Sequence, residues 1–226
     1  MNKKLVVISC FIISVSALYF NLLSDRVIAQ NASKATDKGT PTLKNKLLSA
    51  PQSTDGCQQC HSTSSQYFQE VNGVLSGQHA NYLVKQLSDM QTQKRRLPKD
   101  FLSFHQMPTS KMKSYATYFT QQAKTTLSSN SVDNIAAGKQ LYNFGNDERK
   151  IPACMACHIK NGHGIAEADI PALNGQTNAY IQQQLKNFRS GRRSNDKNNL
   201  MQNTAVRLTD QDITALAHYI TTLDAR

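Results

Sequence analysis

The stretch Cys154-Met155-Ala156-Cys157-His158 contains two cysteines three positions apart, with a histidine directly after the second. This spacing is typical of the attachment of a c-type haem. Two thiols about one helical turn apart can reach the two vinyl groups of one porphyrin, and the adjacent imidazole can bind the iron from the proximal side. A zinc site is the alternative, but it would need two further ligands at finger-like spacing, and none follows. The stretch therefore predicts a covalently bound haem c.

The same pattern occurs 97 residues earlier, at Cys57-Gln58-Gln59-Cys60-His61. A repeat of so specific a spacing is not an accidental cluster. We therefore predict two covalently bound haems c, attached through Cys57, Cys60, Cys154 and Cys157. The imidazoles of His61 and His158 are the predicted proximal iron ligands.

Both halves of the chain continue alike after the motif, which indicates an internal repeat. A Gly-Gln pair precedes the next helix in each half, at Gly77-Gln78 and Gly175-Gln176, an offset of 98 residues. The last helix repeats at an offset of 101, so the first half is three residues shorter before it. Apolar residues at helical spacing give these helices one apolar face. They are Leu83, Leu87, Met90, Met112, Tyr115, Ala116 and Phe119, and then Ile181, Leu185, Phe188, Ile213, Leu216, Ala217 and Ile220.

No Val/Ile/Thr alternation is long enough to predict a strand. We therefore predict an all-α fold of two tandem domains, residues 43–127 and 131–226, joined by the polar stretch Ser128-Ser129-Asn130-Ser131. Domains of this size bury limited apolar surface, so each haem would serve as core as well as cofactor. Thr209 is the predicted N-cap of the last helix, with Asp212 three residues on.

Residues 1–29 have the pattern of an export signal, with an apolar run of 19 residues from Leu5 to Leu23 and a small-residue cleavage site before Gln30. The run is also long enough to span a bilayer, so an uncleaved membrane anchor over residues 5–23 is the alternative. Residues 30–42 are polar and predict a flexible linker. Both alternatives place the folded part outside the cytoplasm, which for a bacterial protein is the periplasm. The fifth cysteine, Cys10, lies in this segment, so no spare thiol remains in the folded part.

The chain is basic, with a formal net charge of +11 and a pI near 9.5. Residues 1–130 carry 15 Lys and Arg against 6 acids, whereas residues 131–226 carry 11 against 9. Such a charge favours an acidic partner or an anionic membrane surface. Nucleic acid is not the expected partner, because the basic residues are dispersed and no nucleic-acid-binding motif is present. Two haems instead predict partners that are redox proteins.

The ligand at the second axial position of each iron determines its chemistry. A methionine there leaves no position for an external ligand and raises the reduction potential of the haem. In the second half, the connection from Ser190 to Arg207 contains one methionine, Met201, which lies 43 residues after His158. Its neighbours are polar and continue no apolar stripe, so a core role is not favoured. We predict that Met201 is the distal ligand of the second haem.

The distal ligand of the first haem is less direct to assign. The positions that correspond to Met201 are Ser103 at an offset of 98 and Asp100 at an offset of 101. We expect Met107, which lies in the corresponding connection 46 residues after His61, to be the ligand. His105 is the alternative and would give a lower potential than a methionine. An open iron is the third possibility.

The second half resembles the class I dihaem cytochromes c of the "c-four" type. The resemblance rests on the haem motif and on Gly138-Lys139-Gln140-Leu141-Tyr142, Pro171-Ala172-Leu173-Asn174-Gly175-Gln176, Tyr180 to Phe188, Gly191-Arg192, Met201 and Leu208-Thr209-Asp210-Gln211-Asp212-Ile213. The first half matches over Cys57 to His61 and Gly77 to Leu87. The resemblance implies two helical domains related by a pseudo-twofold axis. It also implies that the carbonyl of Pro171 accepts the imidazole N–H of His158, with Gly73 at the equivalent position of the first half.

The family resemblance implies a carrier that takes electrons from a quinol-oxidising complex and passes them to a terminal oxidase or reductase. Its basic first half would then dock on an acidic surface. The alternative is a dihaem oxidoreductase, or the cytochrome subunit of one, acting on sulfur compounds or peroxide. Thiosulfate-oxidising dihaem enzymes use a cysteine axial ligand, and no spare cysteine exists here. Met201 argues against a peroxidase at the second haem, whereas a subunit role needs only a partner.

Overall fold

The computed structural model describes residues 54–66, 68, 71–124 and 135–223, which all belong to one compact unit, Leu47–Arg226. Over these residues the fold is helical, and the only β-structure consists of two isolated bridges. The predicted signal or anchor, the linker and the join at residues 128–131 lie outside them, so the domain boundaries stay predictions. No helix among the described residues is long and apolar enough to cross a membrane.

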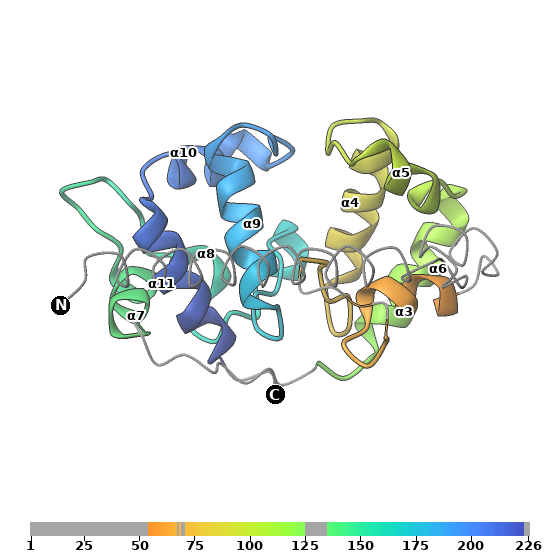
Figure 1. The fold of residues 1–226 in the computed structure, drawn as a ribbon, viewed down its shortest axis with the longest axis horizontal. Coiled ribbons are helices and arrows are strands. Elements are labelled where there is room, and N and C mark those ends of the chain that lie inside the picture. Colours follow the sequence, from red (N-terminus) through yellow and green to blue (C-terminus); the bar gives the residue numbers. More distant parts are fainter. Residues whose placement is uncertain (1–53, 67, 69–70, 125–134, 224–226) are drawn as a thin grey trace, which may run out of the picture. The chain divides into compact units, whose positions relative to one another are not determined.

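The described residues of the first half form four α-helices and one 3-10 helix, which can be followed in Figure 1. They are α3 (Thr54–His61), α4 (Ala80–Gln91), α5 (Lys99–Leu102), η1 (Ser103–His105) and α6 (Thr109–Thr120). Its core is small, with Leu83 of α4 packed against Ala116 and Phe119 of α6. Met90 and Met112 are buried as well, which confirms that these two methionines belong to the protein core. A core this small leaves much of the domain interior to be filled by the haem.

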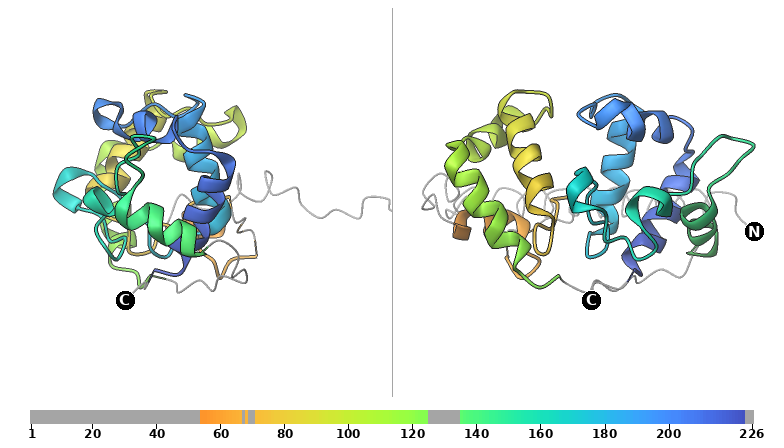
Figure 2. Two further views of the ribbon diagram at one scale, coloured as in Figure 1. Left: turned by 90° about the vertical axis from the view of Figure 1, so that its left-hand side faces the viewer. Right: turned by 180° about the vertical axis from the view of Figure 1, so that it is seen from behind.

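Between residues 135 and 223 the second half forms five α-helices and two 3-10 helices, which can be followed in Figures 1 and 2. They are α7 (Ile135–Phe144), α8 (Met155–His158), η2 (Ala166–Ala168), α9 (Asn178–Arg189), η3 (Lys197–Asn199), α10 (Leu200–Ala205) and α11 (Asp210–Thr221). Its core is larger and joins the apolar faces of α7, α9 and α11. The predicted stripe residues Ile213, Leu216 and Ile220 are all buried in it.

Helices α7 and α11 cross closely because one of them has a glycine at the crossing. A Cβ atom on Gly138 of α7 would lie 2.0 Å from the backbone oxygen of Ala215 in α11. The start of α11 is fixed by a capping box, in which the Thr209 hydroxyl accepts from the Asp212 N–H and the Asp212 carboxylate accepts from the Thr209 N–H. This confirms the predicted cap. Arg149 adds a bidentate ion pair with Asp212 at 2.5 and 3.0 Å.

The two halves meet through a pair of equivalent glutamines. The Gln78 side chain donates to the Ala172 carbonyl and accepts from the Ala172 N–H, both at 2.9 Å. Its counterpart Gln176 makes the same two bonds with the backbone of Val74, at 2.5 and 3.0 Å. Both glutamine side chains are buried. Gln78 and Gln176 are 98 residues apart, as are Val74 and Ala172, so the contact has the pseudo-twofold symmetry that the resemblance implies.

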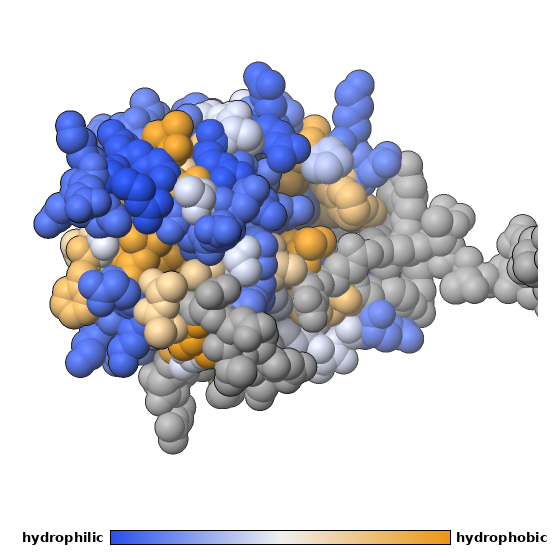
Figure 3. All heavy atoms as spheres, turned by 60° about the vertical axis from the view of Figure 1, so that its left-hand side comes forward, coloured by the Kyte–Doolittle hydropathy of each residue, from blue (hydrophilic) through white to orange (hydrophobic). Residues whose placement is uncertain are grey.

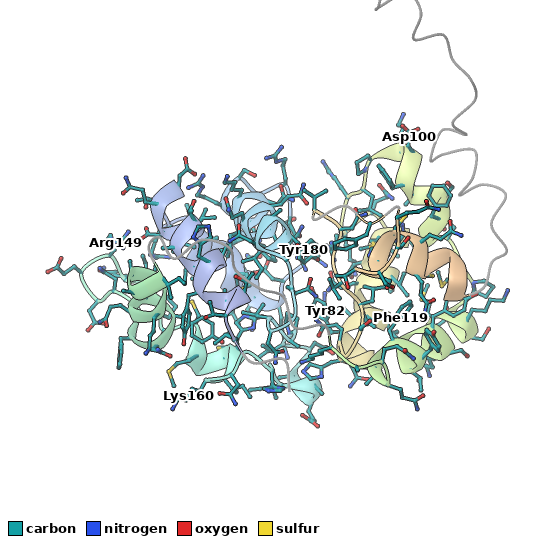
Figure 4. All side chains as sticks on the ribbon, turned by 60° about the horizontal axis from the view of Figure 1, so that its bottom comes forward. Tyr82, Asp100, Phe119, Arg149, Lys160 and Tyr180 are labelled. Carbon is teal, nitrogen blue, oxygen red and sulfur yellow. The ribbon has the colours of Figure 1, made fainter. Side chains whose placement is uncertain are left out.

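A second reciprocal set of contacts joins the segment after each of the helices α4 and α9 to the other helix. Arg95 donates to Tyr180 and Gln184, whereas its counterpart Arg193 donates to Tyr82 and Gln86. Both tyrosines lie in the region between the two halves (Figure 4). Each residue in this set is again 98 positions from its equivalent. The repeat therefore extends from the helices to the polar contacts between the domains.

Candidate functional site: two haem c sites

Each haem motif lies on a short helix at the edge of a cavity. In the first half Cys57, Cys60 and His61 lie on α3. In the second half Cys154 is the N-cap of α8, and His158 is its last residue. Helical geometry holds the two thiols of each motif about one turn apart, as attachment of both to one porphyrin requires. Burial raises the pKa of the Cys154 thiol to about 11, so this thiol is neutral at physiological pH.

Both motif histidines are oriented by a backbone carbonyl. Nδ1 of His61 lies 2.6 Å from the carbonyl oxygen of Gly73, and Nδ1 of His158 lies 3.1 Å from that of Pro171. Because a carbonyl can only accept, Nδ1 carries the hydrogen and Nε2 keeps its lone pair. Burial lowers the pKa of both imidazoles, that of His61 to about 4, which keeps them neutral. A neutral imidazole oriented by such a bond is the form that binds a metal.

The difference between Gly73 and Pro171 has a steric cause. A Cβ atom on Gly73 would lie 2.9 Å from the ring of Tyr180, which belongs to the other half. A proline at position 73 would meet the same ring. The carbonyl that orients His61 is therefore kept on a glycine where the two halves pack together.

One cavity of about 1670 Å³ is lined by both motifs. A site for one drug-sized ligand has a volume of roughly 300–1,000 Å³, so this cavity has room for two large groups. Its lining includes all four motif cysteines and both motif histidines. Apolar side chains of the two cores, such as Leu83 and Ile181, complete the walls. The donor set, the neutral imidazoles and the cavity volume together fit two haems c.

Met201 lies on α10, on the wall of the cavity. The sequence predicted a connection between two helices here, and within it the structure has a short helix from Leu200 to Ala205. The carboxylate of Asp196 accepts from the N–H groups of Met201 and Gln202 and so fixes the first turn. Met201 packs against the core of the second half and lines the same cavity as His158.

The distal side of the first half offers two candidates for the iron. Both His105, the last residue of η1, and Met107 line the cavity together with His61. The rings of His105 and His61 form a T-shaped pair, with centroids 6.1 Å apart and planes at 82°. The backbone between the two candidates is held by Gln91, whose Nε2 donates to the carbonyls of Met107 and His105 at 2.7 and 3.2 Å.

Two arginines of the cavity wall are absent from the site predicted from sequence. Arg95 and Arg193 line the cavity and hydrogen bond across the two halves. Arg193 is buried, and its guanidinium lies 4.5 Å from the centroid of the Phe188 ring. Extending the offset of 98 residues beyond the helix stripes to the polar positions would have identified this pair from the sequence.

Comparisons with known proteins agree with the site. A family model of cytochrome c matches residues 135–224. Cytochrome c4 from Thiocapsa roseopersicina is 34% identical over 167 residues, which cover 73% of this chain and 85% of that protein. The thiosulfate dehydrogenase electron acceptor of Thiomonas intermedia is 41% identical over 85 residues, or 38% of this chain and 39% of that protein.

A solved structure extends the similarity to the fold of both halves. Reduced recombinant cytochrome c4 from Pseudomonas stutzeri has a TM-score of 0.69 and 30% identity, and the match covers 74% of this chain and 93% of that one. The chain belongs to the cytochrome c4 family and consists of two tandem cytochrome c domains, each built around one covalently bound haem c.

Proposed function

We propose that this protein is a periplasmic dihaem carrier that passes electrons through two haems c held in one cavity. The observation that carries the proposal is the shared cavity, which both attachment motifs line. Two redox groups in one low-dielectric interior can exchange electrons without either leaving the protein. The haem supplies the redox chemistry, and the chain binds it, orients the proximal imidazoles and excludes water.

The proposed ligand set follows from the two motifs. Cys57, Cys60, Cys154 and Cys157 form the thioether bonds, and His61 and His158 bind the irons from the proximal side. Met201 is the proposed second axial ligand of the iron in the second haem. Its position on the cavity wall supports this role. For the first iron the sequence predicts Met107, with His105 as the alternative. Mass spectrometry of proteolytic peptides tests the attachment, because each motif peptide should carry the mass of one haem.

In an electron carrier the protein occupies both axial positions of each iron, whereas a catalytic haem has one axial position open. Replacing Met201 with alanine should open the second iron, so that the reduced variant binds carbon monoxide while the wild-type protein does not. Ala205 lies on the same helix and is buried away from solvent, so Ala205→Gly is a matched control for disturbance of α10. Carbon monoxide binding by the wild-type protein would favour a catalytic haem over a carrier.

The proposed partners are redox proteins with an acidic docking surface. A quinol-oxidising complex would be the donor, and a terminal oxidase or reductase the acceptor. The support is the net charge of +11, of which residues 1–130 carry the larger part. Exposed charges are screened within about 8–10 Å at moderate salt, so the rate constant for electron transfer to an acidic partner should fall as ionic strength rises. A rate constant that does not change with salt would contradict this docking mode.

The second half has exposed apolar side chains that could contact a partner in addition to the basic residues of the first half. The face drawn in Figure 3 is largely hydrophilic, with hydrophobic side chains gathered in patches. Leu200 and Val206, at the two ends of α10, are 59% and 62% exposed. Exposed apolar residues beside the helix that carries Met201 are suited to a short-lived contact near the second iron.

A second candidate function is that of an electron-accepting subunit for an enzyme of sulfur-compound oxidation. It is favoured by the similarity to the thiosulfate dehydrogenase electron acceptor of Thiomonas intermedia. The solved structure of a thiosulfate dehydrogenase from Marichromatium purpuratum also matches, with a TM-score of 0.66 and 28% identity over 75% of this chain and 36% of that one. Rapid reduction of the ferric protein by thiosulfate in the presence of a thiosulfate dehydrogenase, but not by thiosulfate alone, would support this role.

A further inference from the structure

The chain between α4 and the first turn of α6 is strongly basic. Residues 92–113 contain six Lys and Arg and one acid, Asp100. The corresponding residues of the second half, 190–214, contain four Lys and Arg and three acids. Both halves have the same fold, so the fold itself does not require this difference in charge.

Five of the six cations of the first half are exposed to solvent. The sixth, Arg95, is turned toward the second half, where it donates to Tyr180. In the described part of the chain none of the five forms an ion pair. We call these five residues the basic patch: Lys94, Arg96, Lys99, Lys111 and Lys113.

The equivalent surface of the second half is neutralised by its own acids. Asp212, which lies 101 residues after Lys111, pairs with Arg149 at 2.5 Å. Asp210 pairs with Arg189 at the same distance. A negatively charged protein is therefore attracted to this surface of the first half more strongly than to that of the second.

The basic patch lies where the haem cavity reaches the surface. Lys94, Lys111 and Phe101 line the cavity whose wall also contains Cys57 and His61. Phe101 is 42% exposed and belongs to α5, which Figure 1 shows at the periphery of the first half. Residues that both line the cavity and meet solvent mark its opening. A protein bound to the patch would therefore lie beside the first haem site.

The composition of this surface fits a protein partner better than a membrane. Phe101 is the only exposed large apolar side chain in residues 92–113, all of which the structure describes. A helix that lies in a membrane surface needs a broad apolar face, whereas α5 has only four residues. An aromatic side chain surrounded by a charged rim is typical of interfaces between proteins.

We propose that the basic patch, together with Phe101, is the docking surface for an acidic redox protein. The proposal deepens the carrier function and rests on it, because it requires a haem at Cys57 and Cys60. One electron then passes between the partner's redox centre and the iron of the first haem. One of the two is oxidised as the other is reduced, and no covalent bond forms or breaks.

Electron-transfer kinetics of two charge variants test the position of the surface. The patch variant is Lys99→Gln/Lys111→Gln/Lys113→Gln. The control variant is Lys139→Gln/Lys150→Gln/Lys160→Gln, which changes three exposed lysines of the second half. Both variants lose three positive charges, so a difference between them depends on where the charges lie. The partners are the purified quinol-oxidising complex and the purified terminal oxidase of the same bacterium, each mixed with the haem-loaded protein by stopped flow.

The patch variant should react more slowly because it has lost electrostatic steering. Since steering raises association rate constants by about 10–1,000-fold, we expect a loss of roughly 10-fold with at least one partner at low ionic strength, against less than about 2-fold for the control variant. The difference should disappear at high salt. Phe101→Ala should weaken binding at every ionic strength, because salt does not screen an apolar contact. Phe144→Ala is its control, since Phe144 is 69% exposed in the second half.

Cross-linking of the wild-type protein gives a measurement that needs no variant. A carbodiimide joins carboxylates of a bound partner to lysine amines that they contact. Mass spectrometry should find the cross-links at lysines of the basic patch and not at the three control lysines.

Three results would overturn the proposal and leave the carrier function intact. The first is equal rate constants for the patch and control variants with both partners, and the second is cross-linking at the control lysines instead of the patch. The third is sedimentation with phosphatidylglycerol vesicles that only the patch variant loses while its rate constants stay at wild-type values, because the patch would then bind membranes. Failure of the wild-type protein to exchange electrons with either partner would instead refute the carrier function itself.

Discussion

The reciprocal glutamine contact predicts how firmly the two domains are joined. Gln78→Met keeps the length and much of the volume of the side chain but removes both hydrogen bonds to Ala172. The N–H and the carbonyl of Ala172 then lose their partners in a position where Ala172 is 2% exposed. The equivalent change on the other side is Gln176→Met, which removes the two bonds to Val74.

The size of the effect follows from burial. A buried polar group left without its hydrogen bond costs about 1–3 kcal/mol, and Gln78→Met leaves two such groups on Ala172. We expect the contact to weaken by about 2–4 kcal/mol, less than the sum of the upper values because the residues can relax or admit water. Since 1.4 kcal/mol is a factor of ten in an equilibrium constant, even about 2 kcal/mol is roughly 30-fold.

Amide hydrogen exchange of Ala172 measures the effect where it arises. Its N–H should exchange at least roughly 30-fold faster in Gln78→Met if exchange follows opening of the contact. Gln122→Met is the matched control, because the Gln122 side chain donates to the carbonyl of Tyr118, one helical turn earlier in the same half. Unchanged protection of Ala172 in Gln78→Met, at unchanged protection of the α11 core, would refute the contact.

Three further changes test the second domain. Gly138→Ala should destabilise it by about 1–3 kcal/mol or more, measured by urea unfolding, because the new methyl group would meet the Ala215 carbonyl. Tyr142→Phe should cost about 1 kcal/mol, since the buried hydroxyl donates to the Ile159 carbonyl at 2.7 Å. Hydrogen bonding and pairing with Arg149 lower the pKa of Asp212 from 3.8 to about 2, so this stabilisation is present above pH 4 and is lost as pH falls toward 2. Asp212→Asn should therefore flatten the dependence of unfolding free energy on pH in that range.

Much of the fold follows from local chemistry and was predicted from the sequence. The haem motifs, the helical stripes and the capping box each depend on residues within about two helical turns of one another. Pro171 followed from the family resemblance, and its carbonyl does accept from His158. The symmetry between the halves was found in the apolar stripes, but the sequence analysis did not extend it to Arg95 and Arg193.

The distal side of the first haem could not be predicted with the same certainty. Ligand choice there depends on which side chain the tertiary structure places opposite His61, and alignment by offset pointed to Ser103 or Asp100. The consecutive helices α5 and η1 position His105, and the Gln91 side chain from α4 donates a hydrogen bond to its carbonyl. Neither is a periodic signal, so spacing within the chain favoured Met107, whereas the structure places both Met107 and His105 on the cavity wall with His61.

The location of the three-residue difference between the halves explains how one haem can diverge alone. The offset is 97 residues at the haem motifs, 98 from Gly73 and Pro171 to Arg95 and Arg193, and 101 from Met112 and Ile213 onward. All reciprocal contacts between the domains precede this change, and both distal segments follow the two arginines. A sequence change in the distal segment of the first half therefore leaves the contacts of Gln78 and its counterpart Gln176 in place. The domains can keep their packing while the residues on the distal side of the first haem site change.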